Sequence, residues 1–240
     1  MRNISRQAPL LLLLLLLVFN FMQGRFSDPA GYFFQLLLQL PGIVVGLSFH
    51  EFAHAWASVR LGDPTPRMQG RLTISPRAHF DPFGFLCLVF CGFGWGVPVE
   101  INPNYYKNRR RDELIVSCAG IAMNILVAVL FGFFAHIVLT IDSTAVFGEA
   151  SLTGILLEIL LYTVIINLTL AVFNLLPVPP LDGFGIVTEL FDLRNKSWYW
   201  TFYNYGMPIL ILLLLVGVVD RILQPLVVFL YIPIYQYIIM

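Results

Sequence analysis

Ser48-Phe49-His50-Glu51-Phe52-Ala53-His54 places two histidines and a glutamate inside an apolar stretch of a 240-residue chain. On a helix, positions i and i+4 share one face, so His50 and His54 can bind one Zn²⁺ while Glu51 acts as a base toward water. An ionised group at mid-membrane costs about 2.5–3.5 kcal/mol on insertion scales, so three ionisable residues here indicate a function. The alternative is a polar cluster that only bonds neighbouring helices.

The composition is that of an integral membrane protein. Hydrophobic residues make up 58% of the chain and charged residues only 12%, whereas soluble domains carry about 25% charged residues. The formal net charge is zero, so neither a strongly basic nor a strongly acidic partner is indicated. The three cysteines, at positions 87, 91 and 118, lie in apolar surroundings, and we interpret them as buried thiols.

Six apolar stretches are long enough to cross, or nearly to cross, a hydrocarbon core of about 30 Å. They fall at residues 9–22, 32–59, 114–141, 152–176, 205–219 and 222–240. We interpret residues 1–24 as a retained first span, because the residues before Arg25 are too bulky for a typical cleavage site. A cleaved signal peptide is the alternative.

The basic residues predict the orientation of these spans. With the N-terminus inside, 12 of the 14 lysines and arginines fall in inner segments, and only Arg25 and Arg221 fall outside. The positive-inside rule therefore predicts an all-α polytopic protein of about six transmembrane helices with both termini cytoplasmic. The Arg109–Arg111 cluster serves as a topology anchor against anionic lipid, and no nucleic-acid partner is needed to explain it.

Residues 83–99 form a further apolar stretch, interrupted by four glycines and Pro98. Basic segments flank it on both sides, so we expect it to enter the membrane near the cytoplasmic side and return as a re-entrant hairpin. Irregular backbone at membrane depth must lie against protein or a wet cavity. Two interpretations stay open: an edge strand that captures an extended substrate by main-chain pairing, or a loop that only packs.

A catalytic zinc keeps three protein ligands, so a third must join the two histidines. We considered His79, Glu100, His136, Glu158, Asp182, Glu189 and Asp192. His136 and Glu158 lie near the outer ends of their spans, at the wrong depth. Asp182 follows a proline-rich stretch at the cytoplasmic end of span 152–176, where an Asp-Gly turn can direct its carboxylate into the bundle.

These motifs together resemble the site-2 protease family of intramembrane zinc metalloproteases, in its compact prokaryotic form without PDZ or CBS domains. The similarity rests on His50-Glu51-Phe52-Ala53-His54 and on the stretch from Asn174 through Pro177, Pro179 and Pro180 to Leu181-Asp182-Gly183. It extends over residues 77–84, 94–99 and 102–103. One departure is Gly120-Ile121-Ala122-Met123-Asn124, where the family commonly has a proline after the glycine.

The resemblance implies one membrane-embedded metalloprotease domain over residues 1–240, with a catalytic core at 32–182 and C-terminal spans at 183–240. One Zn²⁺ per chain would be held by His50, His54 and Asp182, with Glu51 as general base. Asn124 and Asn174 would bind the substrate or its oxyanion, although interhelical hydrogen bonding is their alternative role.

The substrate implied is a transmembrane protein, cut near its cytoplasmic end by an enzyme of the prokaryotic plasma membrane whose active site opens to the cytoplasm. For His79, a supporting or structural role is expected rather than metal ligation. The competing functions are a metal-binding membrane transporter and a catalytically silent scaffold of the same fold. A transporter would need ligands along a path through the bilayer, whereas here they converge at one depth.

Overall fold

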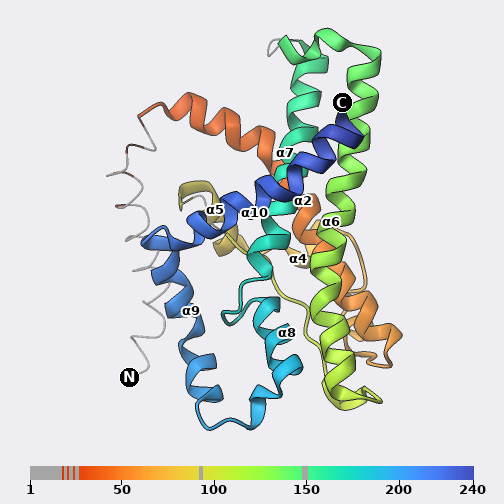
Figure 1. Ribbon diagram of the computed structural model, residues 1–240, viewed down its shortest axis with the longest axis vertical. Coiled ribbons are helices and arrows are strands. Elements are labelled where there is room, and N and C mark those ends of the chain that lie inside the picture. Colours follow the sequence, from red (N-terminus) through yellow and green to blue (C-terminus); the bar gives the residue numbers. More distant parts are fainter. Residues whose placement is uncertain (1–17, 19–20, 22–23, 25–26, 92–93, 148–150) are drawn as a thin grey trace.

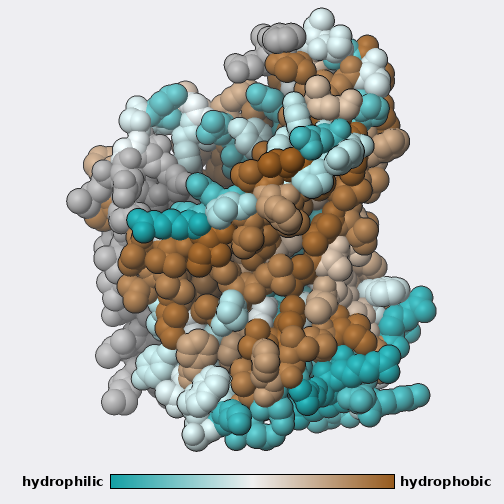
Figure 2. Space-filling model, in the orientation of Figure 1, coloured by the Kyte–Doolittle hydropathy of each residue, from teal (hydrophilic) through white to brown (hydrophobic). Residues whose placement is uncertain are grey.

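The computed structural model describes residues 18, 21, 24, 27–91, 94–147 and 151–240. Within these residues, four helices are long and apolar enough to cross a membrane. They are α2 (Pro29–Arg60), α6 (Arg109–Ile141), α7 (Leu152–Asn174) and α10 (Val218–Ile234), the last continued by η4 (Tyr235–Ile239). The protein is therefore an integral membrane protein built from helices. Figure 2 shows apolar side chains over the middle of one face and hydrophilic ones toward the lower end of α6.

The shorter elements connect and flank these four helices. They are α3 (Thr65–Met68), α4 (Pro76–His79), α5 (Pro82–Cys91), η1 (Pro103–Tyr105), η2 (Ser143–Phe147), α8 (Asp182–Phe191), η3 (Leu193–Asn195) and α9 (Tyr199–Leu215). Helices α2, α6 and α7 pack against one another at the centre, and α8 packs against α6 (Figure 1). The last of these contacts matters for the site, because α8 begins at Asp182.

Two glycines on α2 allow a close approach to α7. A Cβ atom at Gly42 would lie 2.8 Å from the Thr163 Cα, and one at Gly46 would lie 2.7 Å from Leu170 Cδ1. The spacing is that of the small-xxx-small pattern, which lets transmembrane helices pack with their backbones close together. His50 follows Gly46 by one helical turn, so the same face of α2 carries the histidine into the three-helix centre.

The expected spans agree with the structure for 32–59, 114–141 and 152–176, which correspond to α2, α6 and α7. The last predicted span corresponds to α10 with η4. The fifth corresponds to α9, which has 17 residues and ends two residues before Gly217, whose φ of 72° breaks the helix. The first span, 9–22, lies outside the described residues except for Val18 and Phe21.

The glycine-rich stretch differs in detail from the expected hairpin. Its first arm is α5, and residues 94–99 form no regular element. The chain nevertheless turns back on itself: a Cβ atom at Gly84 would collide with the backbone carbonyl of Trp95, and one at Gly94 with the carbonyl of Gly84. The glycines therefore allow the two arms to lie in close contact. The described residues contain no strand, so the edge-strand interpretation gains no support.

Candidate metal centre

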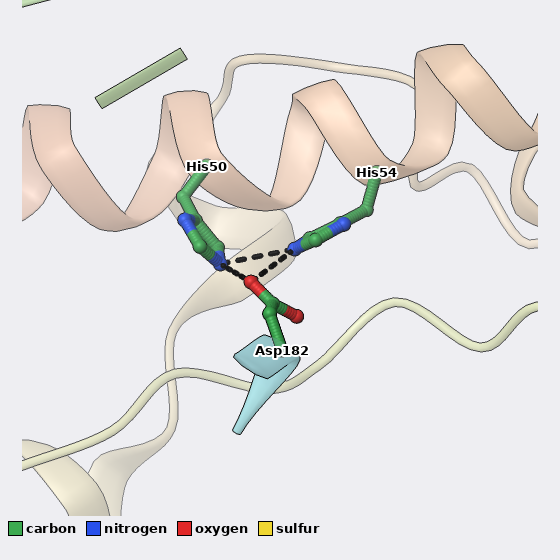
Figure 3. Close-up of side chains that lie close together, drawn as sticks. All are labelled: His50, His54 and Asp182. Carbon is green, nitrogen blue, oxygen red and sulfur yellow. Dashed lines mark hydrogen bonds and ion pairs between the residues drawn. The ribbon is translucent and has the colours of Figure 1, made fainter. Parts of the chain in front are cut away.

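Three side chains from two helices converge on one point (Figure 3). His50 and His54 come from α2, and Asp182 is the first residue of α8. The two Nε2 atoms are 3.0 Å apart, and Asp182 Oδ2 lies 3.2 Å from that of His50 and 3.3 Å from that of His54. Residues 50 and 182, far apart in the sequence, thus become neighbours because α2 and α8 both pack on α6.

The other ring nitrogens fix how each imidazole is protonated. His50 Nδ1 lies 2.6 Å from Asn124 Oδ1, and His54 Nδ1 lies 2.8 Å from the Val116 carbonyl oxygen. The Asn124 amide is oriented because its Nδ2 donates to the Gly46 carbonyl oxygen at 3.1 Å and to Asn167 Oδ1 at 2.9 Å. Both Nδ1 atoms therefore face acceptors and carry the proton, which leaves each Nε2 lone pair free to bind a metal.

The arrangement fits a tetrahedral zinc ion. Two ligands at about 2.0–2.1 Å from a tetrahedral zinc lie roughly 3.3 Å apart, close to the three distances observed. Asp182 Oδ2 is buried and has no hydrogen-bond partner among the described residues. Two lone pairs and a carboxylate oxygen would repel one another at this range without a cation. His50 and His54 are only 6% and 9% exposed, so they have little contact with water. A bound cation would take the place of that missing solvation.

Helix α6 closes one side of this group. A Cβ atom at Gly120 would lie 2.5 Å from His54 Nε2 and 2.5 Å from His50 Cε1. Any other residue at this position would therefore push against both imidazoles. The glycine belongs to the stretch that departs from the family pattern, and the structure gives it a role in making room for the metal-binding rings.

Glu51 lies beside the metal-binding group and contacts a different segment. Its Oε2 accepts a 2.8 Å hydrogen bond from the backbone N–H of Val99. The Val97–Val99 segment is held in turn, since the Val97 N–H donates to the His79 carbonyl oxygen at 2.9 Å. Arg71 donates to the carbonyl oxygens of Val97 and Pro98, at 3.2 and 3.0 Å. The second arm of the glycine-rich stretch thus orients the carboxylate of Glu51.

A buried network joins the end of α2 to the chain that follows this segment. Asp63 is fully buried and accepts hydrogen bonds from Ser58 Oγ, from the Thr65 N–H and from the Asn102 N–H, at 2.8, 2.9 and 2.8 Å. Burial tends to raise the pKa of this carboxyl, but the three donors outweigh it and hold the pKa below its usual value. Burial raises the pKa of Tyr106, whose hydroxyl lies 2.7 Å from Ser58 Oγ, to about 12.

Of the other residues selected from the sequence, Asn124 joins the site and Asn174 does not join the metal-binding group. Asn124 is fully buried, and its amide atoms bond His50, Gly46 and Asn167. Asn174 ends α7, and its Nδ2 donates to the Leu170 carbonyl oxygen at 3.0 Å. His79 lies outside the metal-binding group, with Nε2 at 2.9 Å from the Thr73 carbonyl oxygen.

Sequence reasoning missed Asn167, Gly120 and the backbone of Val99. Asn167 had a detectable signal, because it lies seven residues before Asn174 and so shares a face of α7. Gly120 had a weaker signal: it is a glycine that lies four residues before Asn124 on a long apolar helix. Val99 had none, since its contribution is a backbone N–H and depends only on where the chain returns.

Comparisons with known proteins agree with this chemistry. The model of peptidase family M50 matches residues 39–217. YwhC of Bacillus subtilis, named as a zinc metalloprotease, is 33% identical over 183 residues, covering 76% of this chain and 82% of that protein. Rip2 of Mycolicibacterium smegmatis, also named as a zinc metalloprotease, is 27% identical over 199 residues, covering 80% and 72%. No solved structure matches the chain.

Proposed function

Because the chain belongs to peptidase family M50, the site-2 protease family of zinc metalloproteases, we propose that it hydrolyses peptide bonds of membrane-embedded proteins near their cytoplasmic ends. The observation that supports this proposal most strongly is the position of the metal-binding group. His50 and His54 lie within α2, one of the four helices able to cross a membrane, and Asp182 follows α7, another of them. A protease site built between such helices suits substrates that lie in the same bilayer.

The ligand set in this proposal is His50, His54 and Asp182. A zinc ion held there would supply Lewis acidity, which would activate water as a nucleophile and polarise a carbonyl group. The remaining chemistry belongs to the chain. Asn124 keeps His50 in the tautomer that leaves Nε2 free, and the Val116 carbonyl oxygen does the same for His54.

Glu51 is the general base in this proposal. It takes a proton from the attacking water and delivers it to the leaving amide nitrogen of the substrate. The hydrogen bond from the Val99 N–H to Oε2 fixes the carboxylate and leaves Oε1 to accept the proton. Because the Val99 N–H holds Oε2, the carboxylate keeps its orientation through both proton transfers.

The two asparagines take different roles. The contacts of Asn124 support a positioning role, which replaces the substrate-binding role expected from the resemblance. For Asn174 we keep substrate binding as the proposal. Its Nδ2 donates within α7, and its Oδ1 carries no hydrogen bond in the described part of the chain, so that oxygen can accept an N–H of an unwound substrate.

The orientation of the protein is part of the proposal. Twelve of the 14 basic residues fall inside when both termini are cytoplasmic, which puts the end of α2, the start of α6 and the start of α8 on the cytoplasmic side. Water would then reach the metal-binding group from the cytoplasm.

The experiment compares the wild-type enzyme with Glu51→Gln. The purified variant should keep one zinc per chain and lose turnover by at least about 10²- to 10⁴-fold, since Glu51 serves two proton transfers. Quantitative membrane proteomics of cells carrying either form should show transmembrane proteins that accumulate uncut in the variant. Near-wild-type cleavage by Glu51→Gln would refute the proposed chemistry. Accumulation of soluble proteins alone would refute the substrate class.

A further inference from the structure

Helix α8 carries the third metal ligand at its first residue, and one face of the helix is directed at α6. Asp182, Gly185 and Glu189 are spaced i, i+3 and i+7, so they share that face. A Cβ atom at Gly185 would lie 2.7 Å from Ser117 Oγ of α6. The two helices therefore touch closely at Gly185, with Asp182 on one side of this contact and Glu189 on the other.

Beyond this contact lies a group of three charged residues, Glu113, Glu189 and Arg194, here called the Glu–Arg latch. Arg194 Nε donates to Glu189 Oε1 at 2.8 Å, and its guanidinium also pairs with Glu113. The two carboxylate side chains are each only 7% exposed, and that of Arg194 is 30% exposed. Arg194 therefore bridges the first turns of α6 to the last turns of α8 where water is scarce.

A second arginine strengthens the same end of α8. Arg110, from the start of α6, donates to the backbone carbonyl oxygens of Glu189 and Leu190, the latter at 2.6 Å. A cation at the last carbonyl groups of a helix donates to acceptors that have no partner within the helix. It also interacts favourably with the negative end of the helix dipole. Arg110, a member of the basic cluster, thus also binds the end of α8.

The contact at Gly185 is a point about which the short helix α8 can tilt. Gly185 lies three residues from Asp182 and four from Glu189, which at 1.5 Å per residue is about 4.5 and 6 Å along the axis. Any tilt of α8 about the Gly185–Ser117 contact therefore moves Asp182 by a distance similar to the one that Glu189 moves. With the three ligand atoms only 3.0–3.3 Å apart, a tilt of this kind would open the metal-binding group.

We propose that Arg194 is a positioning residue for zinc binding: the Glu–Arg latch holds the far end of α8 against α6 and thereby keeps Asp182 beside the two histidines. Removing Arg194 leaves the buried carboxylate of Glu189 without its ion-pair partner and leaves Glu113 paired only with Arg109 of its own helix, so no cation links the two helices and that end of α8 separates from α6. The inference rests on the proposed ligand role of Asp182, and Asp182→Asn provides the reference for it.

The test uses the full chain purified in detergent, with zinc affinity measured by competition with a chelator. Arg194→Gln should weaken zinc binding about tenfold or more, in the range found for groups that orient metal ligands. Arg194→Lys should recover part of the loss because it restores the charge. Arg111→Gln is the matched control: it is an exposed arginine of the same cluster, and its side chain makes no contact with the latch.

Cobalt substitution separates positioning from a general loss of structure. The visible absorption bands of Co²⁺ report its ligand geometry, so they should change in Arg194→Gln and stay unchanged in Arg111→Gln. Should Arg194→Gln not fold, the triple variant Glu113→Gln, Glu189→Gln, Arg194→Gln carries the test, since it removes the buried charges together. It should fold and still bind zinc more weakly than the wild type.

The outcomes are distinct. If Asp182→Asn weakens zinc binding while the latch variants bind zinc with wild-type affinity and an unchanged cobalt spectrum, the latch proposal is overturned and the ligand assignment stands. If Asp182→Asn itself keeps wild-type affinity, Asp182 is not a zinc ligand, and the latch proposal falls with that assignment. Equal loss in Arg194→Gln and Arg111→Gln would also overturn the proposal, because it would point to the charge of the surface rather than to the latch.

Discussion

The backbone N–H of Val99 donates a 2.8 Å hydrogen bond to Oε2 of Glu51. This contact joins the second arm of the glycine-rich stretch to the residue expected to move protons. The Val97 N–H is also engaged, with the His79 carbonyl oxygen, and the Val97 and Pro98 carbonyl oxygens accept from Arg71. Both N–H groups of residues 97–99 and the carbonyl oxygens of Val97 and Pro98 are thus engaged within the protein, which favours a supporting role over pairing with substrate.

The first prediction concerns Arg71. Replacing it with alanine removes both hydrogen bonds from Nη2 to the Val97 and Pro98 carbonyl oxygens, so the Val99 N–H should move away from Glu51. Misplacement of a catalytic group by about 1 Å can cost roughly 100-fold, and we expect kcat to fall about 10- to 100-fold with zinc content unchanged. Arg67→Ala, which changes an exposed arginine of the nearby helix α3, is the control. Full activity of Arg71→Ala would exclude this role.

The second prediction concerns the metal ligands. The wild-type protein should contain about one zinc per chain, and alanine at His50, His54 or Asp182 should sharply lower that content. His136→Ala should keep it, because its Nδ1 lies 2.9 Å from the Ile239 carbonyl oxygen, in contact with η4 rather than with the metal-binding group. Elemental analysis of the purified variants measures the content. Full zinc in Asp182→Ala would remove that residue from the ligand set.

The third prediction separates the two asparagines. Asn124→Ala removes the acceptor that holds the His50 tautomer and should weaken zinc binding about 10- to 100-fold. Asn174→Ala should leave zinc affinity unchanged and raise KM or lower kcat for a transmembrane substrate. Chelator competition and steady-state kinetics on the same preparations make the comparison. Equal zinc loss in both variants would show that bundle packing, not the His50 contact, is what Asn124 supplies.

The fourth prediction concerns orientation. In a cysteine-free variant, single cysteines placed at Ser143 and at Lys196 should react from opposite sides with a membrane-impermeant maleimide. Ser143 lies in η2 between α6 and α7, and Lys196 follows η3. Labelling of the Lys196 position from outside intact cells would reverse the assigned topology.

The fifth prediction uses the buried carboxylate of Asp63. Because its pKa in the folded protein is below the unfolded value of about 3.8–3.9, its contribution to stability is present above that value and is lost as the pH falls toward the folded pKa. Asp63→Asn should destabilise the protein by about 1–3 kcal/mol at pH 7, and the difference should shrink at or below pH ~3. Thermal unfolding in detergent across this pH range measures it. A constant difference would contradict the assignment.

The sequence by itself determined the class of protein and the chemistry of its centre. Helical spacing places His50 and His54 on one face whatever surrounds them, and low charge with long apolar stretches requires helices that can cross a membrane. The proline-rich stretch before Asp182 requires a break after α7. These features are local, so they can be read from neighbouring residues without knowledge of the fold.

Only the tertiary structure decided which distant groups support that centre. The packing of α6 on α2 places Asn124 Oδ1 2.6 Å from His50 Nδ1, a contact that the sequence of neither helix predicts. Val99 acts through a backbone N–H, which has no signature in the sequence. The pairing of Arg194 with Glu113 joins residues 81 positions apart. Such contacts depend on how helices pack, because a side chain's partner is set by the neighbouring helix and not by its own.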